Sequence, residues 1–298
     1  MLHSAAWVRQ IPWVFWLNDF LTPYIGNRLA VNNRHGGVRN LALKEVDART
    51  RKNADLVKHG EDQERDILAR LISIHDEKPA DFNYDDVVSM ATSNVGAGSD
   101  TTAISLRAII FFLLKNPRAM ASLMHELQQA KKEGHLSDPV QMSEAANLPY
   151  LQACLYEALR LHPAVGFSLP RIVPAGGITI AGTYIPAGTT VGANPWVVHR
   201  QTEIFGDDVE EFRPERWLGG ADDARVGDRK RFFFAFGGGS RGCIGRNISW
   251  MEMEKLVPTL LMRFEMELVW PERELEETCW WFVMQKGLYV RVKRRGVS

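Results

Sequence analysis

Long stretches of the chain repeat their hydrophobic residues every three or four positions, which is the spacing of one face of an α-helix. This pattern predicts helices near 38–57, 63–75, 85–115, 117–132, 150–161 and from 244 to about 262. Shorter alternating segments predict strands at 177–181, 183–185, 265–270 and 287–293. The pattern therefore predicts a mainly α-helical chain with a small β portion. No internal repeat, low-complexity tract or interdomain linker interrupts it, so we expect one domain over 1–298.

Composition narrows the class of protein without identifying it. The 298 residues are 45% hydrophobic. Lys+Arg and Asp+Glu are equal at 36 each, so the chain lacks the excess of positive charge that is typical of nucleic-acid-binding proteins. The three cysteines, Cys154, Cys243 and Cys279, are neither even in number nor closely spaced, which argues against a disulfide framework and indicates a reducing compartment. The histidines show no paired spacing, which argues against a zinc or di-iron site.

The most informative segment is a glycine-rich loop that precedes a predicted helix, Phe-Gly-Gly-Gly-Ser-Arg-Gly-Cys-Ile-Gly at 236–245. The positive end of that helix and its free N–H groups favour the thiolate form of the cysteine. Two glycines leave clearance for a flat, bulky ligand, the arginine suits a carboxylate, and the phenylalanine offers apolar cover. A haem needs these features together. The residues concerned are Phe236, Gly239, Arg241, Cys243 and Gly245.

Two other interpretations of this loop stay open at this point. Gly237-x-Gly239-x-x-Gly242 follows an apolar, strand-like run at 232–236 and precedes a helix, as in a dinucleotide-binding turn. Such a turn belongs to an alternating βα chain, however, whereas only about fifty residues follow here in a largely helical chain. Alternatively, Cys243 is a small buried apolar residue, which is the usual fate of a lone cysteine. On this segment alone, the buried-cysteine and haem interpretations are comparable.

A polar run within a long predicted helix suggests a second functional feature. Ala-Gly-Ser-Asp-Thr-Thr occupies 97–102. Glycine and hydroxyl side chains loosen a helix, and a threonine that competes for backbone carbonyls can admit water. With the carboxylate of Asp100 beside Thr101, the opening suits a proton relay. The alternative is a tolerated glycine with polar residues that face solvent.

A third feature is a pair of opposite charges in apolar surroundings. Glu157 and Arg160 are three residues apart and therefore lie on one helix face. Their neighbours are largely apolar, so we expect the pair to be buried and to need a further partner. Arg216, in Phe-Arg-Pro-Glu-Arg-Trp at 212–217, is the candidate. The alternative is an ordinary surface ion pair.

Taken together and in this order, these segments resemble the cytochrome P450 family over essentially the whole chain. The loop fits Phe-x-x-Gly-x-Arg-x-Cys-x-Gly, and the polar run fits Ala/Gly-Gly-x-Asp/Glu-Thr-Thr. The charge pair fits Glu-x-x-Arg, and 214–217 fits Pro-Glu-Arg-Phe/Trp. The residues at 196–200, 205–217 and 281–286 are further similar to those of the pisatin demethylase-like family members of filamentous fungi.

The resemblance implies a role for each singled-out residue. Cys243 would be the axial thiolate of the haem iron, with Phe236, Gly239 and Gly245 around the cofactor. Asp100 and Thr101 would deliver protons to dioxygen through water. The other implied roles are haem propionate contacts for Arg241 and Arg171, a structural cluster of Glu157, Arg160 and Arg216, and a substrate pocket lined by Ala97, Val165, Phe167 and Phe282.

The activity that the resemblance implies is a haem-dependent monooxygenase, which inserts one oxygen atom from O2 into an apolar small molecule. Its setting would be fungal secondary metabolism or detoxification, with electrons from an NADPH-dependent flavoprotein reductase. Two alternatives stay open: a truncated remnant without catalysis, and a haem-thiolate isomerase or dehydratase. The presence of both Asp100 and Thr101 disfavours the second alternative, because that chemistry needs no protons delivered to dioxygen.

The front of the chain departs from the family pattern. Family members carry a long N-terminal region with a membrane anchor, so the chain resembles the C-terminal portion of a P450 domain. The apolar run at 11–17 is too short to span a bilayer and matches a loop that often contacts the membrane surface. For the full-length family member, we expect the cytosolic face of the endoplasmic reticulum membrane.

Overall fold

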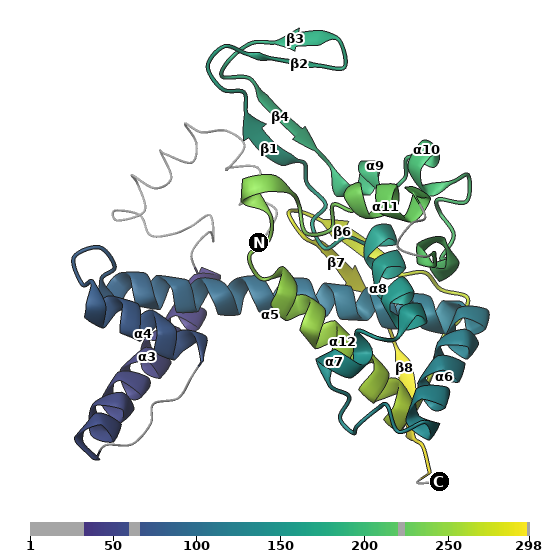
Figure 1. The fold of residues 1–298 in the computed structure, drawn as a ribbon, viewed down its shortest axis with the longest axis horizontal. Helices are drawn as coiled ribbons and strands as arrows, with labels where there is room; N and C mark the ends of the chain where they lie inside the picture. The colour runs from purple at the N-terminus through teal and green to yellow at the C-terminus, as the bar shows by residue number, and fades with distance from the viewer. Residues whose placement is uncertain (1–32, 60–65, 220–223, 297–298) are drawn as a thin grey trace. The chain divides into compact units, whose positions relative to one another are not determined.

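The computed structural model describes residues 33–59, 66–219 and 224–296, and these are mainly helical with small antiparallel sheets (Figure 1). The expected fold class is therefore confirmed. Two compact units make up the chain, residues 1–100 and 101–298, and helix α5 (Tyr84–Lys115) contributes to both. The single domain stays a prediction. The apolar run at 11–17 lies outside the described residues.

The first unit contains α3 (Asn33–His59), α4 (Ile67–Glu77) and the beginning of α5. Helix α4 begins at Ile67 because the carboxylate of Asp66 accepts a hydrogen bond from the Ala69 N–H at 2.8 Å. A small apolar cluster holds these helices together. Its buried members are Ala42, Val46, Leu71, Ile72, Val87 and Val88.

Helix α5 begins with a capping box and then runs without a break. The Asn83 side chain accepts from the Asp86 N–H at 3.1 Å, and the Asp86 carboxylate accepts from the Asn83 N–H at 2.9 Å. The helix continues through 97–102, so the opening predicted for that run is not present as an interruption. The Ser105 hydroxyl donates to the Thr101 carbonyl at 3.1 Å, alongside an intact helical ladder.

Among the described residues, α5 is the one helix long and apolar enough to cross a bilayer. Within its most apolar stretch of 18 residues, 39% are buried inside the protein. A core helix of a soluble protein meets the same criterion, so this finding supports no localisation.

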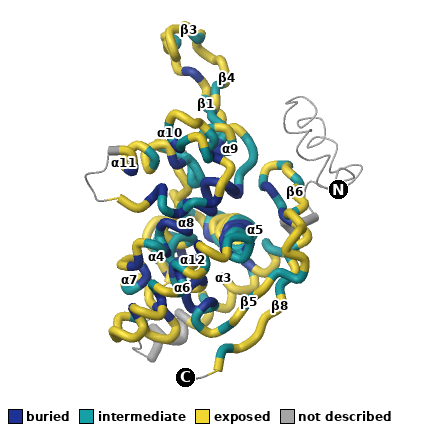
Figure 2. Tube along the Cα trace, turned by 90° about the vertical axis from the view of Figure 1, so that its right-hand side faces the viewer, coloured by how far each residue is buried: buried dark blue, intermediate teal, exposed yellow. Residues whose placement is uncertain are grey.

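The second unit is built around α8 (Pro149–Leu161), in which nine of the 13 residues are buried (Figure 2). Its apolar side chains join one large core cluster, against which α6 and α12 also pack. The helices of this unit, besides α5 and α8, are α6 (Pro117–Lys132), α7 (Met142–Ala145), α9 (Pro195–Val198), α10 (Thr202–Phe205), η1 (Pro214–Trp217), α11 (Ala224–Arg231), η2 (Gly239–Arg241) and α12 (Arg246–Arg263).

The N-terminus of α8 is capped by a side chain from another helix. Leu148 occupies the N-cap position and provides no side-chain cap. Instead, the carboxylate of Glu126 on α6 accepts from the N–H groups of Tyr150 at 2.8 Å and Leu151 at 2.9 Å. Burial raises the pKa of Glu126, although both hydrogen bonds act in the opposite direction. The otherwise free amides of α8 are thus satisfied by α6.

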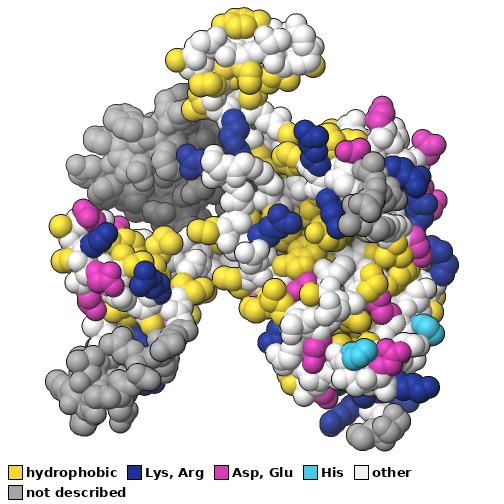
Figure 3. All heavy atoms as spheres, viewed as in Figure 1, with side chains coloured by type: hydrophobic (Ala, Val, Ile, Leu, Met, Phe, Trp, Pro, Cys, Tyr) yellow, Lys and Arg dark blue, Asp and Glu magenta, His cyan; other side chains and the backbone are white. Residues whose placement is uncertain are grey.

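The β portion consists of antiparallel pairs: β1 (Leu169–Ile172) with β4 (Thr190–Ala193), β2 (Ile178–Ile180) with β3 (Thr183–Ile185), β5 (Phe264–Leu268) with β8 (Val290–Arg294), and β6 (Glu276–Cys279) with β7 (Val283–Lys286). Strands β2, β3, β5 and β8 confirm the four predicted strands. The β2–β3 hairpin projects beyond β1 and β4 (Figure 1). Its surface displays hydrophobic side chains, among them Tyr184 with 61% of its area exposed (Figure 3).

Candidate functional site

A pocket of about 180 Å³ in the second unit brings together segments far apart in the sequence. Its walls come from the part of α5 in this unit, from the residues after α8 and from the glycine-rich loop. Most of the wall is apolar, with hydroxyl groups on the α5 side and one sulfur on the loop side. The residues of interest in the wall are Thr101, Thr102, Val165, Phe236, Arg241 and Cys243.

Backbone hydrogen bonds close the loop that carries the sulfur. The Gly237 N–H donates to the Phe234 carbonyl at 2.9 Å, and the Cys243 N–H donates to the Phe236 carbonyl at 2.8 Å. Gly237 and Gly239 have φ of 68° and 65°, a backbone conformation that glycine adopts without strain. Helix α12 begins at Arg246, two residues later than predicted, so Cys243 precedes its first turn.

The position of Cys243 decides between the interpretations of this loop. Cys243 is exposed, so the prediction of a small buried apolar residue is wrong. Residues 232–236 form turns and irregular backbone, and no strand precedes the glycines, so the dinucleotide-binding turn is also wrong. What remains is a thiol in a pocket wall, accessible to a ligand.

The two glycines singled out in the sequence differ in what they do. A side chain at Gly239 would meet no atom of the described chain within 4 Å, so the constraint there is its positive φ. At Gly245, an added Cβ would lie 3.8 Å from the Cys243 sulfur, in ordinary contact with it. The absence of a side chain at Gly245 therefore leaves space beside the sulfur.

The aromatic and basic residues around the loop are anchored by their neighbours. The Phe236 ring lies edge-on to Trp250 at 6.0 Å between centroids, and the Arg246 guanidinium lies 5.7 Å from the Phe236 centroid. Arg171, on β1, donates to the Gly238 carbonyl at 3.3 Å, which ties that strand to the loop. Arg241 lines the pocket itself.

The α5 wall presents hydroxyl groups toward the pocket. Thr101 and Thr102 both line it, and the Thr102 and Ser249 hydroxyls lie 3.0 Å apart, joining α5 to α12. Asp100 directly precedes Thr101 on the same helix, but it belongs to the first unit, as does Ala97. The structure thus places Thr101 at the pocket and leaves the roles of Asp100 and Ala97 as predictions.

Two of the predicted substrate contacts lie against each other next to the pocket. Val165 lines it and forms an antiparallel bridge with Phe282, just before β7. Phe167 stacks on Trp281 with ring centroids 5.8 Å apart. The segment after α8 and the β6–β7 hairpin are thereby joined at this wall. Their contact with a substrate stays a prediction.

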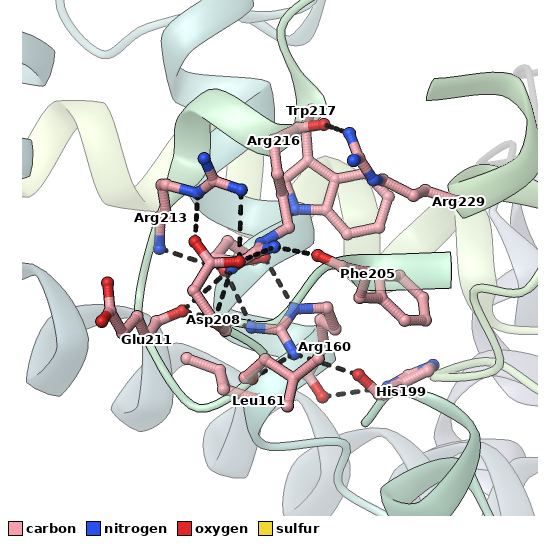
Figure 4. A network of polar contacts seen from close by, with 12 residues as sticks. Arg160, Leu161, His199, Phe205, Asp208, Glu211, Arg213, Arg216, Trp217 and Arg229 are labelled. Atoms are coloured by element: carbon pink, nitrogen blue, oxygen red, sulfur yellow. Dashed lines mark hydrogen bonds and ion pairs between the residues drawn. The ribbon is translucent and has the colours of Figure 1, made fainter. Parts of the chain in front are cut away.

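The charged residues predicted to cluster meet in the core, away from water. Glu157 receives hydrogen bonds from Arg160 at 2.9 Å and from Arg216 at 2.7 Å, and all three side chains are fully buried. The Trp217 indole N–H also donates to this carboxylate, at 2.7 Å. In Figure 4 the guanidinium groups of Arg160 and Arg216 point into one network. We call Glu157, Arg160 and Arg216 the buried charge cluster.

Further partners of the cluster come from residues 199–211, between the end of α9 and the start of η1. Arg160 donates to the backbone carbonyls of His199, Val209 and Glu211, and Arg216 donates to that of Phe205. The Asp208 carboxylate accepts from Arg216 at 3.0 Å. Burial raises the pKa of Asp208, but the hydrogen bond and charge of Arg216, together with the charge of Arg213 and a backbone hydrogen bond, lower it overall.

Sequence reasoning missed Trp217 and His199 as members of this region. Trp217 belongs to a quoted motif, but a tryptophan in a motif does not reveal that its N–H faces a buried carboxylate. His199 is fully buried, and its ring stacks on Phe233 with centroids 5.4 Å apart. A histidine followed by an arginine gives no such signal, because its burial depends on residues far away in the sequence.

The comparisons with known proteins agree with this geometry. The family profile described as Cytochrome P450 matches residues 9–291. The chain belongs to the cytochrome P450 family. Proteins of this family bind haem and use O2 together with a redox partner. The resemblance stated from the motifs is therefore confirmed.

Individual P450 relatives come from fungi. Cytochrome P450 monooxygenase cicH of Emericella nidulans is 41% identical over 99% of this chain and 58% of its own length. Cytochrome P450 monooxygenase hepC of Aspergillus oryzae is 40% identical over 90% of this chain and 50% of its own length. Pisatin demethylase of Fusarium vanettenii is 42% identical over 74% of this chain and 41% of its own length. The chain thus spans roughly half the length of these P450 relatives.

The residues at the pocket fit a haem. Cys243 supplies an exposed thiol, Arg241 supplies a cation in the same wall, and the remaining wall is largely apolar. Within the described residues, no three His, Cys, Asp or Glu side chains gather as ligands for a free metal ion. A haem iron needs only one such ligand from the protein, because the porphyrin nitrogens would supply most of the other ligands.

Proposed function

We propose that this chain is the haem-binding part of a P450 monooxygenase, which inserts one oxygen atom from O2 into an apolar small molecule. The observation that supports the proposal most directly is the pocket itself. The exposed thiol of Cys243 and the hydroxyl-bearing face of α5 line one cavity whose wall is otherwise largely apolar. A ligand in that cavity would contact a thiolate, proton-bearing groups and an apolar surface at once.

In this proposal, Cys243 holds the iron, and Arg241 and Arg171 neutralise the propionates. The bound haem would supply the oxygen chemistry. Phe236, fixed by its contacts with Trp250 and Arg246, covers the apolar edge of the site. Gly239 and Gly245 let the backbone approach the cofactor closely.

The α5 hydroxyls hold and move protons at the pocket wall. Thr101 lines the pocket, and Asp100 precedes it in sequence, so we assign the hydroxyl of Thr101 and the acid of Asp100 to proton delivery. Thr101 lies in the polar run at 97–102 and lines the cavity, so it is our choice for the group that presents a proton there.

The apolar wall indicates the class of substrate. Val165, Phe167 and Phe282 would contact a hydrophobic molecule, and Ala97 would do so from α5. The relatives are fungal P450 monooxygenases and a pisatin demethylase, and we assign this chain to fungal secondary metabolism or detoxification. We assign an NADPH-dependent flavoprotein reductase as electron donor, and the cytosolic face of the endoplasmic reticulum membrane as location of the full-length protein.

Absorption spectra of the purified, dithionite-reduced protein with and without carbon monoxide test the proposal. We expect the red-shifted Soret band of a thiolate-ligated carbonyl complex, and substrate screening with the reductase and NADPH would follow. Cys243→Ser should lose this band with an unchanged circular dichroism spectrum, because Cys243 is exposed. Cys279→Ser is the matched control, since Cys279 is also exposed. If Cys243→Ser keeps the band, or the parent chain binds no haem, the proposal fails.

A further inference from the structure

His199 links the buried charge cluster to the backbone of the cysteine loop. The backbone N–H of Phe234 donates to Nε2 of His199 at 2.7 Å. The other ring nitrogen, Nδ1, lies 2.9 Å from the carbonyl oxygen of Arg160. The histidine ring therefore bridges a residue of α8 and a residue two positions before Phe236.

The two partners fix the protonation state of this ring. Nε2 accepts a hydrogen bond from an amide, so it carries no proton of its own, and Nδ1 must be the nitrogen that donates to the Arg160 carbonyl. The ring is therefore neutral. Burial lowers the pKa of His199 to about 3, in agreement with this assignment.

Arg160 and His199 are paired in both directions. The Arg160 guanidinium donates to the His199 carbonyl at 3.0 Å, while the His199 ring donates to the Arg160 carbonyl. Figure 4 shows His199 beside Arg160. The Phe233 ring stacks on the imidazole, and Phe205 meets it edge-on. Two hydrogen bonds and two aromatic contacts thus leave the imidazole a single orientation.

Beyond Phe234, backbone hydrogen bonds lead directly to the sulfur-bearing residue. The Phe234 carbonyl accepts from the Gly237 N–H, and the Phe236 carbonyl accepts from the Cys243 N–H. Displacement of Phe234 would therefore shift the acceptor that holds Cys243. From this arrangement we infer that His199 is a positioning residue, which holds the cysteine loop in register with the buried charge cluster. Its relevance to a haem ligand rests on the proposed function.

Histidine suits this position for a chemical reason. The bridge needs an acceptor for the Phe234 amide and a donor for the Arg160 carbonyl, on one rigid neutral group. A phenylalanine keeps the ring and its stacking but loses both hydrogen bonds. A glutamine keeps one donor and one acceptor, without the ring.

Amide hydrogen exchange in the chain without haem tests the inference independently of the cofactor. His199→Phe should speed exchange at Phe234, Gly237 and Cys243 by roughly tenfold, because the Phe234 amide loses its buried acceptor. His199→Gln should restore most of the protection. His162→Phe is the matched control. Like His199, His162 is buried and directly follows a helix, in this case α8, but it bonds to Glu277 and the Val283 carbonyl, in the β6–β7 hairpin.

The outcomes separate this inference from the proposed function. Faster exchange confined to 234–243 in His199→Phe supports it, and equal exchange in His199→Phe and His162→Phe overturns it, whether or not haem binds. In haem-loaded protein, His199→Phe should also shift the carbonyl complex away from the thiolate band. If His199→Phe does not fold, the trans-hydrogen-bond coupling between the Phe234 and His199 Nε2 nitrogens in the unaltered chain decides, and its absence overturns the inference.

Discussion

The buried charge cluster and the cysteine loop differ in how complete they are within this chain. Glu157, Arg160 and Arg216 are fully buried, and their hydrogen-bonding groups meet each other, the segment between α9 and η1, and Trp217. On the loop, by contrast, Cys243 is exposed and Ile244 has 94% of its area exposed. The hydrogen-bond partners of the cluster all lie in the second unit, whereas the Cys243 thiol on the loop is left accessible to a ligand.

This difference teaches which motif reports on folding and which on chemistry. A charge inside a protein core is tolerated only when its partners are present, so a completed cluster indicates that the surrounding fold is intact. An accessible thiol contributes little to that fold and is available to a ligand. Substitutions in the buried charge cluster should accordingly lower stability, whereas substitution of the exposed Cys243 should mainly remove its chemistry.

The largest effect on stability should follow from Glu157→Gln. It removes the negative charge that faces two fully buried guanidinium groups, so we expect a loss of about 3–5 kcal/mol in the free energy of unfolding. Urea denaturation followed by circular dichroism measures it. The control is Glu265→Gln, which breaks the more exposed pair with Arg295 and should cost about 1 kcal/mol or less. Equal losses of unfolding free energy in the two variants would contradict the special contribution of the buried charge cluster to stability.

Acid should lower the free energy of unfolding through His199, which lies beside the buried charge cluster. The unfolded histidine takes up a proton near pH 6.5, but the folded one stays neutral down to about pH 3, so falling pH favours unfolding between these values. His199→Gln should remove up to about 1.4 kcal/mol per pH unit of this dependence. Arg160 and Arg200 are the charged groups that act on His199.

Unfolding free energies at pH 6.5, 5.5 and 4.5 test this prediction. The difference between the parent chain and His199→Gln is the quantity of interest, because the pKa values of Glu126 and Glu254 are raised in both proteins and their effect cancels. Parallel pH profiles would show that His199 already binds its proton in the folded state.

A smaller effect should come from the loop itself. Gly237 has φ of 68°, so Gly237→Ala should cost about 1–2 kcal/mol. Gly238 has extended backbone, with φ of −162°, and an added Cβ would lie 3.8 Å from Phe234, so Gly238→Ala should be nearly neutral. The two unfolding free energies, measured side by side, provide the check. A costly Gly238→Ala would mean that the loop is packed more tightly than its exposure indicates.

Periodicity predicted the long helices and several strands because those signals are local. The edges of α6 and α8 follow from Pro117 and Pro149, which are visible in the sequence. Strand β6 was missed because Glu-Glu-Thr-Cys at 276–279 has no apolar alternation and becomes a strand only through pairing with β7. The break expected at 97–102 did not occur, because glycine and threonine do not interrupt a helix fixed by packing at both ends.

The candidate site was predictable as far as its motifs reach. The sequence placed Cys243 before a helix and paired Glu157 with Arg160, because both features rest on short spacings. It did not indicate that Asp208 accepts from Arg216, or that His199 holds Phe234, because these contacts join segments whose proximity only the fold creates. An added side chain at Gly239 would meet no atom of the described chain, so the clearance expected there can only concern a bound ligand.

The carboxylate of Glu126 has a further consequence for the geometry of α8. By binding the amides of Tyr150 and Leu151, it fixes where the first turn of α8 begins, and hence the rotational phase of every residue that follows. Glu157 lies about two turns beyond Tyr150, so it returns to nearly the same side of the helix. Helix α6 therefore sets the rotation of α8 about its own axis. One carboxylate on α6 determines the direction in which the buried charges of α8 point.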